Sequence, residues 1–139
     1  DGAKVIEFNV RFGDPETQAV LPRLKSDLLD LLQRAVTPGG LEGAQLEWDD
    51  RAAVTVVLAS RGYPASSSKG DVIEGLDAAD AEVTHAGTAL ENGNLVTAGG
   101  RVLNVTALGA DREAARAAAY AAADKITFPG KTYRRDIAA

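Results

Sequence analysis

The chain has 139 residues, and 15 Lys and Arg stand against 20 Asp and Glu, so its formal net charge of −5 argues against a nucleic-acid-binding surface. It has no cysteine and one histidine, which excludes disulfides, thiolate metal sites, a cysteine nucleophile and multi-histidine metal sites. Hydrophobic residues make up 45% of the chain, enough for a single core, but no apolar run approaches the roughly 20 residues of a membrane span.

The first apolar run, residues 5–10, has the period-two pattern of a strand. Glu7 and Asn9 alternate with apolar residues, so their side chains would share one face of that strand. A strand so close to the first residue needs a partner, and the chain contains no methionine. We therefore expect a C-terminal part of a longer protein, whose remainder lies upstream of Asp1. Without that remainder, residues 1–10 are expected to fray or to dock on the surface.

Residues 14–36 carry helical patterns. Asp14 is typical of a helix N-cap and Pro15 of the first helical position, while Pro22 then interrupts the helix. From residue 22 to residue 36 the leucines recur at helical spacing, which predicts one amphipathic helix. Its outer face is predicted to carry two i,i+4 ion pairs, Arg23 with Asp27 and Asp30 with Arg34. The Thr-Pro-Gly-Gly run at 37–40 ends this helix and predicts a domain boundary there.

Residues 41–139 have the pattern of a strand meander with one late helix, and we expect them to fold without help. Strands are predicted at residues 44–48, 52–60, 83–90, 95–97 and 101–108. Asn92-Gly93 is the strongest hairpin signal, and Asp111 is expected to cap an alanine-rich helix that runs to about Ile126. The tail at 128–137 alternates loosely, as an edge strand does. The predicted fold class is α+β with a mostly antiparallel sheet.

Chemistry-bearing side chains are concentrated at residues 7–16. Glu7 and Asn9 place a carboxylate and an amide oxygen side by side, a pair suited to a hard cation such as Mg²⁺. Arg11 would lie on the same strand face, and its planar guanidinium can bind phosphate or carboxylate through two hydrogen bonds. Asp14 and Glu16 follow at the expected helix start. From spacing alone, an exposed polar strand face with Asp14 as an ordinary cap explains these residues more simply.

The run E-F-N-V-R-F-G-D-P-E-T-Q at residues 7–18 resembles the last catalytic strand of the ATP-grasp fold, and more narrowly that of the glycinamide ribonucleotide synthetase family. Further segments that resemble this family follow in its order at residues 24–28, 62–64, 69–70, 85–88, 99–109 and 133–137. The resemblance therefore covers nearly the whole chain. It implies the C-terminal end of an ATP-grasp domain at residues 1–40, followed at 41–139 by a small α+β domain that covers the active site.

The resemblance also implies an activity and its cofactors. Such ligases join glycine to 5-phosphoribosylamine in purine synthesis, using ATP with Mg²⁺ or Mn²⁺ and passing through glycyl phosphate. They work in the cytoplasm, with no nucleic-acid or membrane partner. Because the nucleotide-clamping half should lie upstream of Asp1, we expect the isolated chain to be inactive.

Roles for single residues come from the same resemblance. Glu7 and Asn9 fall on the family's metal-ligand positions. Arg11 would be catalytic, stabilising charge on the transferring phosphoryl group or on the carboxylate. Asp14, Glu16 and Lys69 would contact substrate.

Other interpretations remain open at this point. The chain could belong to a sibling ATP-grasp ligase with another acid and amine, or be a free-standing, non-catalytic α+β binding module. Lys69 also fits a solvated loop lysine, and His85 fits a hydrogen-bonded structural histidine. Strand parity does not decide whether Arg101 points into the cleft or outward. Arg134 and its neighbour form a short basic pair, for which Asp136 is the obvious local partner.

Overall fold

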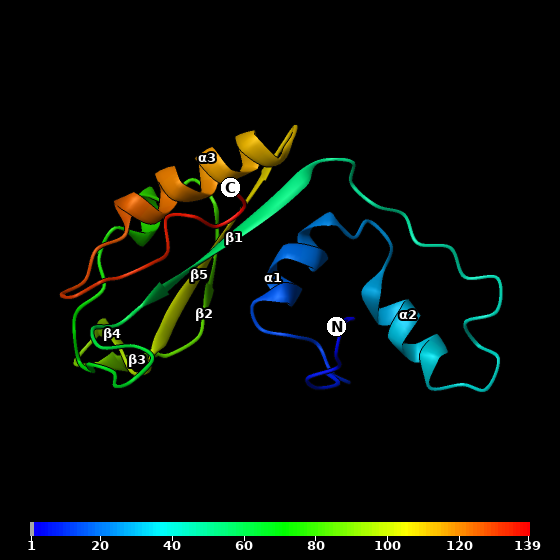
Figure 1. The fold of residues 1–139 in the computed structure, drawn as a ribbon, viewed down its shortest axis with the longest axis horizontal. Coiled ribbons are helices and arrows are strands. Elements are labelled where there is room, and N and C mark those ends of the chain that lie inside the picture. Colours follow the sequence, from blue (N-terminus) through cyan, green and yellow to red (C-terminus); the bar gives the residue numbers. More distant parts are fainter. Residues whose placement is uncertain (1) are drawn as a thin grey trace.

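The computed structural model describes residues 2–139 and has an α+β architecture built on antiparallel strands (Figure 1). In chain order the elements are α1 (Glu16–Val20), a 3-10 turn (Leu21–Arg23), α2 (Leu28–Ala35), β1 (Ala52–Ala59), a second 3-10 turn (Leu76–Ala78), β2 (Glu82–His85), β3 (Thr88–Glu91), β4 (Asn94–Thr97), β5 (Arg101–Gly109) and α3 (Arg112–Lys125). One sheet has the strand order β1-β5-β2, and β3 pairs with β4 in a separate hairpin. The predicted fold class, with one packed helix, is confirmed.

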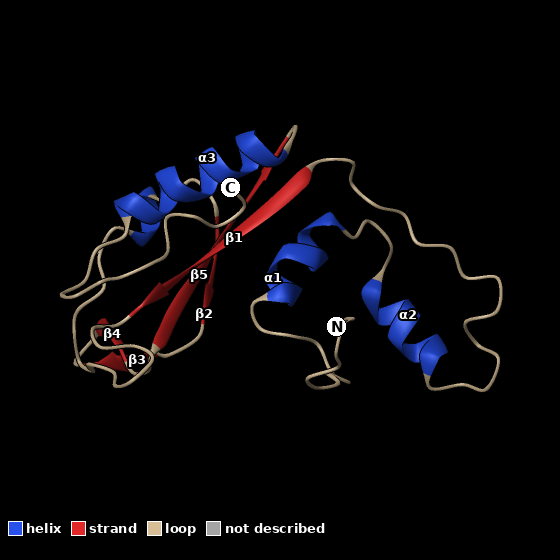
Figure 2. Cartoon of the chain, viewed as in Figure 1, coloured by secondary structure: helices blue, strands red, loops and turns tan. Residues whose placement is uncertain are grey.

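Helix α3 lies along the three-stranded sheet (Figure 2), and the core is packed between this helix and one face of the sheet. On β1, Val54, Val56 and Leu58 are buried and alternate with residues that point to the other face. Their antiparallel partners on β5 are Ala107, Val105 and Leu103. The helix contributes mainly small side chains to this core: Ala115, Ala119, Ala122 and Ala123. Small residues on that face let the helix backbone approach the sheet closely.

Two features predicted from local sequence signals, a hairpin turn and a helix cap, are present in the structure. Asn92 and Gly93 both have positive φ, 51° and 82°, which is the two-residue turn that joins β3 to β4. The Asp111 side chain accepts a hydrogen bond from Ala114 N at 2.8 Å and so caps α3. Both features depend on residues a few positions apart, and both predictions are confirmed.

The strand predicted at residues 83–90 is divided in the structure into β2 and β3. Between them the chain bends at Gly87, whose N–H donates to Arg101 O at 2.8 Å. A Cβ on Gly87 would lie 2.7 Å from Gly99 Cα, so the bend needs glycine. The strand predicted at 44–48 is also wrong, since this segment joins the rest of the chain through a single bridge between Leu24 and Trp48.

The continuous helix predicted at residues 22–36 does not form. The chain is extended at Leu24, and α2 begins at Leu28 because the Asp27 side chain accepts hydrogen bonds from Leu29 N at 2.8 Å and Asp30 N at 3.1 Å. Asp27 therefore caps a helix instead of pairing with Arg23. The Arg23 side chain donates to Asp49 O at 3.1 Å. The other predicted pair, Asp30 with Arg34, forms at 4.0 Å.

The strand predicted at residues 5–10 is also absent from the structure. Residues 2–10 are exposed and have no regular secondary structure, and Ile6, Phe8 and Val10 are 83–97% exposed. No described strand lies beside them, and an unpaired strand would leave its backbone polar groups without partners. The tail predicted as an edge strand meets the sheet at a single bridge, Ala59 with Thr132, and the bridge between Glu74 and Thr127 lies outside the sheet.

None of the helices within residues 2–139 is both long enough and apolar enough to cross a membrane.

Candidate functional site

The candidate metal and catalytic residues lie on the exposed segment before α1. Glu7, Asn9 and Arg11 are all exposed. The Asn9 side chain accepts a hydrogen bond from Arg11 N at 3.4 Å, and the Arg11 guanidinium donates to Phe12 O at 2.9 Å. Because residues 2–10 have no regular secondary structure, these three residues are neighbours in the sequence but do not share a strand face.

Asp14 and Glu16 lie where the chain enters α1. Asp14 does not cap the helix as predicted: Pro15 occupies the N-cap position, and no side chain caps α1. Instead, Asp14 Oδ1 accepts a hydrogen bond from Gln18 Nε2 at 2.9 Å, and Asp14 Oδ2 lies 3.1 Å from the Arg101 guanidinium. Glu16 is exposed in the first turn of α1, where a negative charge suits the helix dipole.

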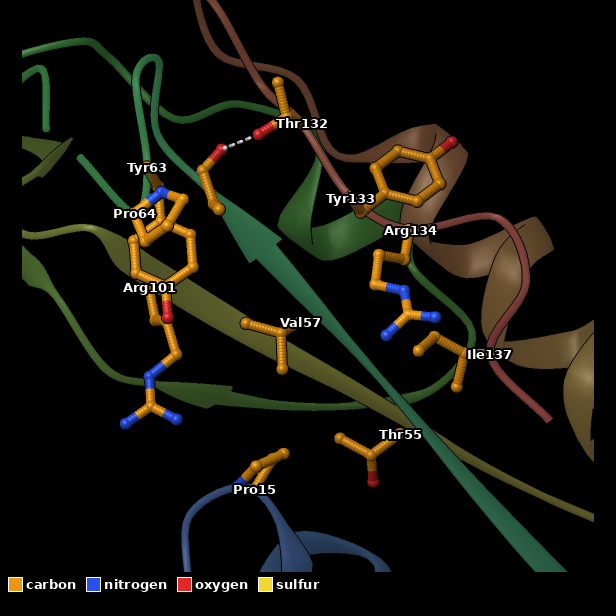
Figure 3. A pocket seen from close by; sticks show the side chains of 11 residues that line it. Pro15, Thr55, Val57, Tyr63, Pro64, Arg101, Thr132, Tyr133, Arg134 and Ile137 are labelled. Carbon is orange, nitrogen blue, oxygen red and sulfur yellow. Dashed lines mark hydrogen bonds between the residues drawn. The ribbon is translucent and has the colours of Figure 1, made fainter. Parts of the chain in front are cut away.

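A cavity of about 510 Å³ lies next to this turn, on the sheet face opposite α3 (Figure 3). Its floor is the outward face of β1, with Thr55 and Val57. Tyr63, Pro64 and Arg101 form one wall, residues of the C-terminal tail form the other, and Pro15 closes one end. The entry to α1 and the 52–139 region therefore share this cavity.

Two guanidinium groups line opposite walls of the cavity, Arg101 on one and Arg134 on the other (Figure 3). Each has a carboxylate partner, Asp14 for Arg101 at 3.1 Å and Asp136 for Arg134 at 2.6 Å. Hydrogen bonding from Arg134 lowers the pKa of the Asp136 carboxyl. Asp136 is thus the local partner that the sequence indicated. The cavity therefore carries a guanidinium on each wall, each already paired with a carboxylate, above a floor that holds Thr55 and Val57.

The tail wall is held by hydrogen bonds to its own backbone. The Tyr120 hydroxyl donates to Arg134 O at 2.7 Å, and the Arg116 guanidinium donates to Ile137 O at 2.9 Å. Thr132 O accepts from Ala59 N at 2.8 Å on the edge of β1. Tyr133 packs into the wall, and burial together with its hydrogen bond to Asp124 raises its pKa.

The glycines before β5 shape the opposite wall. A Cβ on Gly100 would lie 2.6 Å from the Tyr63 ring, so the ring packs directly on the backbone there. His85 Nδ1 lies 3.0 Å from Thr88 Oγ1, a hydrogen bond that agrees with a structural role for this histidine. Lys69 is exposed and does not line the cavity, so the structure does not bring it to the other candidate residues.

For a metal ion, the chain offers two hard oxygen donors, Glu7 and Asn9. Among residues 2–139, no group of three or more His, Cys, Asp or Glu side chains could hold a metal ion. Mg²⁺ in phosphoryl-transfer sites is commonly held by one or two protein oxygens, with phosphate and water supplying the rest. The chemistry of this donor pair fits such an ion.

The contact that sequence reasoning missed is the one between Asp14 and Arg101. These residues are 87 positions apart, and the Arg101 guanidinium also donates to Asp14 O at 2.8 Å. No local pattern marks such a contact. The available signal was that both residues fall in segments that resemble the same family.

Comparison with known proteins gives matches over the whole chain. Residues 53–139 match the family model described as "Phosphoribosylglycinamide synthetase, C domain". A phosphoribosylamine–glycine ligase of Caldanaerobacter subterraneus subsp. tengcongensis is 51% identical over 140 residues, which cover 100% of this chain and 33% of that protein. One of Streptomyces coelicolor is 53% identical, over 99% of this chain and 35% of that protein.

A solved structure gives the same result for the fold. The crystal structure of a phosphoribosylamine–glycine ligase from Thermotoga maritima has a TM-score of 0.77 and 41% sequence identity to this chain. It covers 96% of this chain, and the match spans 33% of the crystallised chain. This chain therefore spans about a third of the length of the relatives that it matches.

Proposed function

The chain belongs to the phosphoribosylglycinamide synthetase family, whose C domain it contains, and on this basis we propose that the protein carrying it is a phosphoribosylamine–glycine ligase. The observation that carries the proposal is the extent of the match. The Caldanaerobacter relative matches all of this chain, including residues 7–18, which lie outside the span of the family model. The proposal therefore covers the candidate catalytic segment as well as the C domain.

The proposed reaction has two steps. An oxygen of the glycine carboxylate attacks the γ-phosphorus of ATP, which forms glycyl phosphate and releases ADP. The amine of 5-phosphoribosylamine then attacks the glycyl carbonyl carbon, loses a proton and displaces inorganic phosphate. An amide bond forms at the expense of one phosphoanhydride bond. Such chemistry depends on positioning and charge neutralisation, so it needs no cysteine or histidine nucleophile.

We assign Arg11 to the negative charge that develops during the first step. Its exposed guanidinium can bind a phosphoryl group or a carboxylate through two parallel hydrogen bonds. Glu7 and Asn9 would hold Mg²⁺ or Mn²⁺, which would neutralise part of the phosphate charge when bound. In the sequence, Arg11 lies two residues from Asn9 and four from Glu7.

Asp14 and Glu16 belong to the proposed substrate side of the site. Pro15 lines the cavity between β1, Arg101 and the tail, and Asp14 pairs with Arg101 on its wall. We keep Lys69 as a third proposed substrate contact, although it lies outside this cavity. In this proposal residues 1–40 end an ATP-grasp domain, and residues 41–139 cover the active site.

The test is ADP formation by the complete protein, with each substrate omitted in turn. Glycine, Mg²⁺-ATP and phosphoribosylamine generated in place should all be required. ADP formation with another amino acid but not with glycine would identify a sibling ligase instead. The complete protein folded but inactive with every amino acid would contradict the ligase proposal, and the isolated 139-residue chain should show no turnover.

A further inference from the structure

Within residues 2–139, one side chain makes the polar contacts between the N-terminal 40 residues and the region from residue 52 onward. Arg101 donates from Nη1 to Asp14 O at 2.8 Å, and its Nη2 lies 3.1 Å from Asp14 Oδ2. The other hydrogen bonds that leave the first 40 residues end in the 41–50 connection, such as Lys25 N to Glu47 O at 2.9 Å. Within the described residues this is the single polar link between the entry to α1 and the sheet, against which α1 and the first 3-10 turn also pack directly.

We propose that Arg101 is a positioning residue for the reaction: it holds the Gly13–Pro15 turn, and through it Arg11, in register with the cavity wall. This inference rests on the proposed ligase function. Arg101 acts through Asp14 and is not itself assigned a contact with substrate.

The geometry of the contact supports positioning rather than a simple ion pair. One guanidinium binds both the main-chain oxygen and the carboxylate of Asp14, so it fixes the orientation of that residue as well as its place. Asp14 in turn accepts a hydrogen bond from Gln18 on α1, which links the turn to the helix. An ammonium group, as in lysine, cannot reproduce the planar fork that reaches two acceptors in fixed directions.

Arg101 is itself firmly supported. It begins β5, the central strand of the three-stranded sheet, and pairs with Ala59 of β1. Its carbonyl oxygen accepts a hydrogen bond from Gly87 N at 2.8 Å. Its side chain is 39% exposed and that of Asp14 is 42% exposed, and half-exposed ion pairs contribute little to stability. Removing the guanidinium should therefore leave the fold intact while it releases the turn.

The first experiment is steady-state kinetics of R101Q, R101K and D14N in the complete protein. A displacement of about 1 Å in a phosphoryl-transfer site can cost about 100-fold, so we expect kcat of R101Q to fall about 100-fold with smaller changes in KM. R101K should recover only part of the rate. The R101Q/D14N double variant should be no slower than R101Q, because R101Q already removes the guanidinium with which the Asp14 carboxylate pairs.

The matched control is R51Q. Arg51 is another exposed arginine with a carboxylate partner, Asp49 at 2.7 Å, but this pair is local to the connection before β1. R51Q should keep kcat and each KM within about two-fold of the unsubstituted protein, as expected for an exposed pair outside the site. Equal losses in R51Q and R101Q would overturn the positioning role.

A second readout needs no substrate. Thr17 N donates to Gly13 O at 3.1 Å, so amide hydrogen exchange in α1 reports on the turn. We expect faster exchange across residues 17–21 in R101Q and R101K, and unchanged exchange in R51Q. If the unsubstituted protein has no ligase activity, the proposed function is refuted. If amide exchange in R101Q is unchanged, the positioning role is refuted.

The kinetic pattern separates positioning from direct substrate binding. If Arg101 binds a substrate anion, R101Q should raise KM for phosphoribosylamine or glycine. The loss of activity in the double variant should then be the sum of the losses in R101Q and D14N. That result would overturn the proposal. The proposal is supported if D14N lowers kcat by part of the loss seen in R101Q, if adding D14N to R101Q lowers kcat no further, and if exchange in α1 is faster.

Discussion

Truncating Leu103 to alanine tests how the sheet and α3 are held together. Leu103 is fully buried and belongs to the same core cluster as Leu58 and the alanines of α3. Leu to Ala changes in cores cost about 2–5 kcal/mol, more when the surroundings cannot collapse into the space. The alanine side chains of α3 are too short to fill that space. We therefore expect a loss of about 3–4 kcal/mol in the free energy of unfolding.

The assay is urea unfolding of the 139-residue chain, followed by far-UV circular dichroism, with L90A as the matched control. Leu90 is also a strand leucine, but it is 77% exposed, so its truncation should cost less than about 0.5 kcal/mol. For a chain of 139 residues, a loss of about 3 kcal/mol lowers Tm by roughly 10 °C. A cost for L103A below about 1 kcal/mol, or one equal to that of L90A, would refute the packing argument.

Three further predictions concern a helix cap, a charge pair and the metal ligands. D111A removes the acceptor for Ala114 N and should lower the free energy of unfolding by about 1 kcal/mol, measured in urea; no change would show that the cap is redundant. Hydrogen bonds from Arg51 hold the pKa of Asp49 well below its usual range. The charged Asp49 therefore stabilises the fold at neutral pH, and this stabilisation is lost as the pH falls below the usual pKa of a carboxyl group. D49N should therefore destabilise the chain at pH 7 and progressively less toward pH 3; a pH-independent difference would contradict this sign. E7Q in the complete protein should abolish metal-dependent turnover without unfolding it, and near-normal activity in folded E7Q would remove Glu7 from the metal site.

Features set by neighbouring residues could be predicted from the sequence. The turn at Asn92-Gly93 needs two positive φ values, which these residue types favour, and the Asp111 cap lies three residues from its donor. The strands predicted at 95–97 and 101–108 also lie within one residue of β4 and β5. Where two local signals competed, the prediction was wrong: Asp27 was assigned to an ion pair with Arg23, but its carboxylate caps α2.

Features that depend on distant partners could not be predicted from local patterns. The alternation at residues 5–10 indicates a strand, but a strand needs a neighbour, and none of the described strands lies beside it. Gly87 divides β2 from β3 because Gly99 packs against it from twelve positions away. The candidate site shows the same limit. The residue types at 7–16 indicated its chemistry, whereas the link from Asp14 to Arg101 depends on the fold.

The most direct test of the proposed ligase reaction follows oxygen from glycine into phosphate. The complete protein is supplied with glycine labelled with ¹⁸O at both carboxylate oxygens, together with Mg²⁺-ATP and phosphoribosylamine generated in place. If the carboxylate takes the γ-phosphoryl group, each phosphate released carries one ¹⁸O and the amide product keeps the other. Formation of the amide product together with unlabelled phosphate would contradict the acyl phosphate, and with it the proposed reaction.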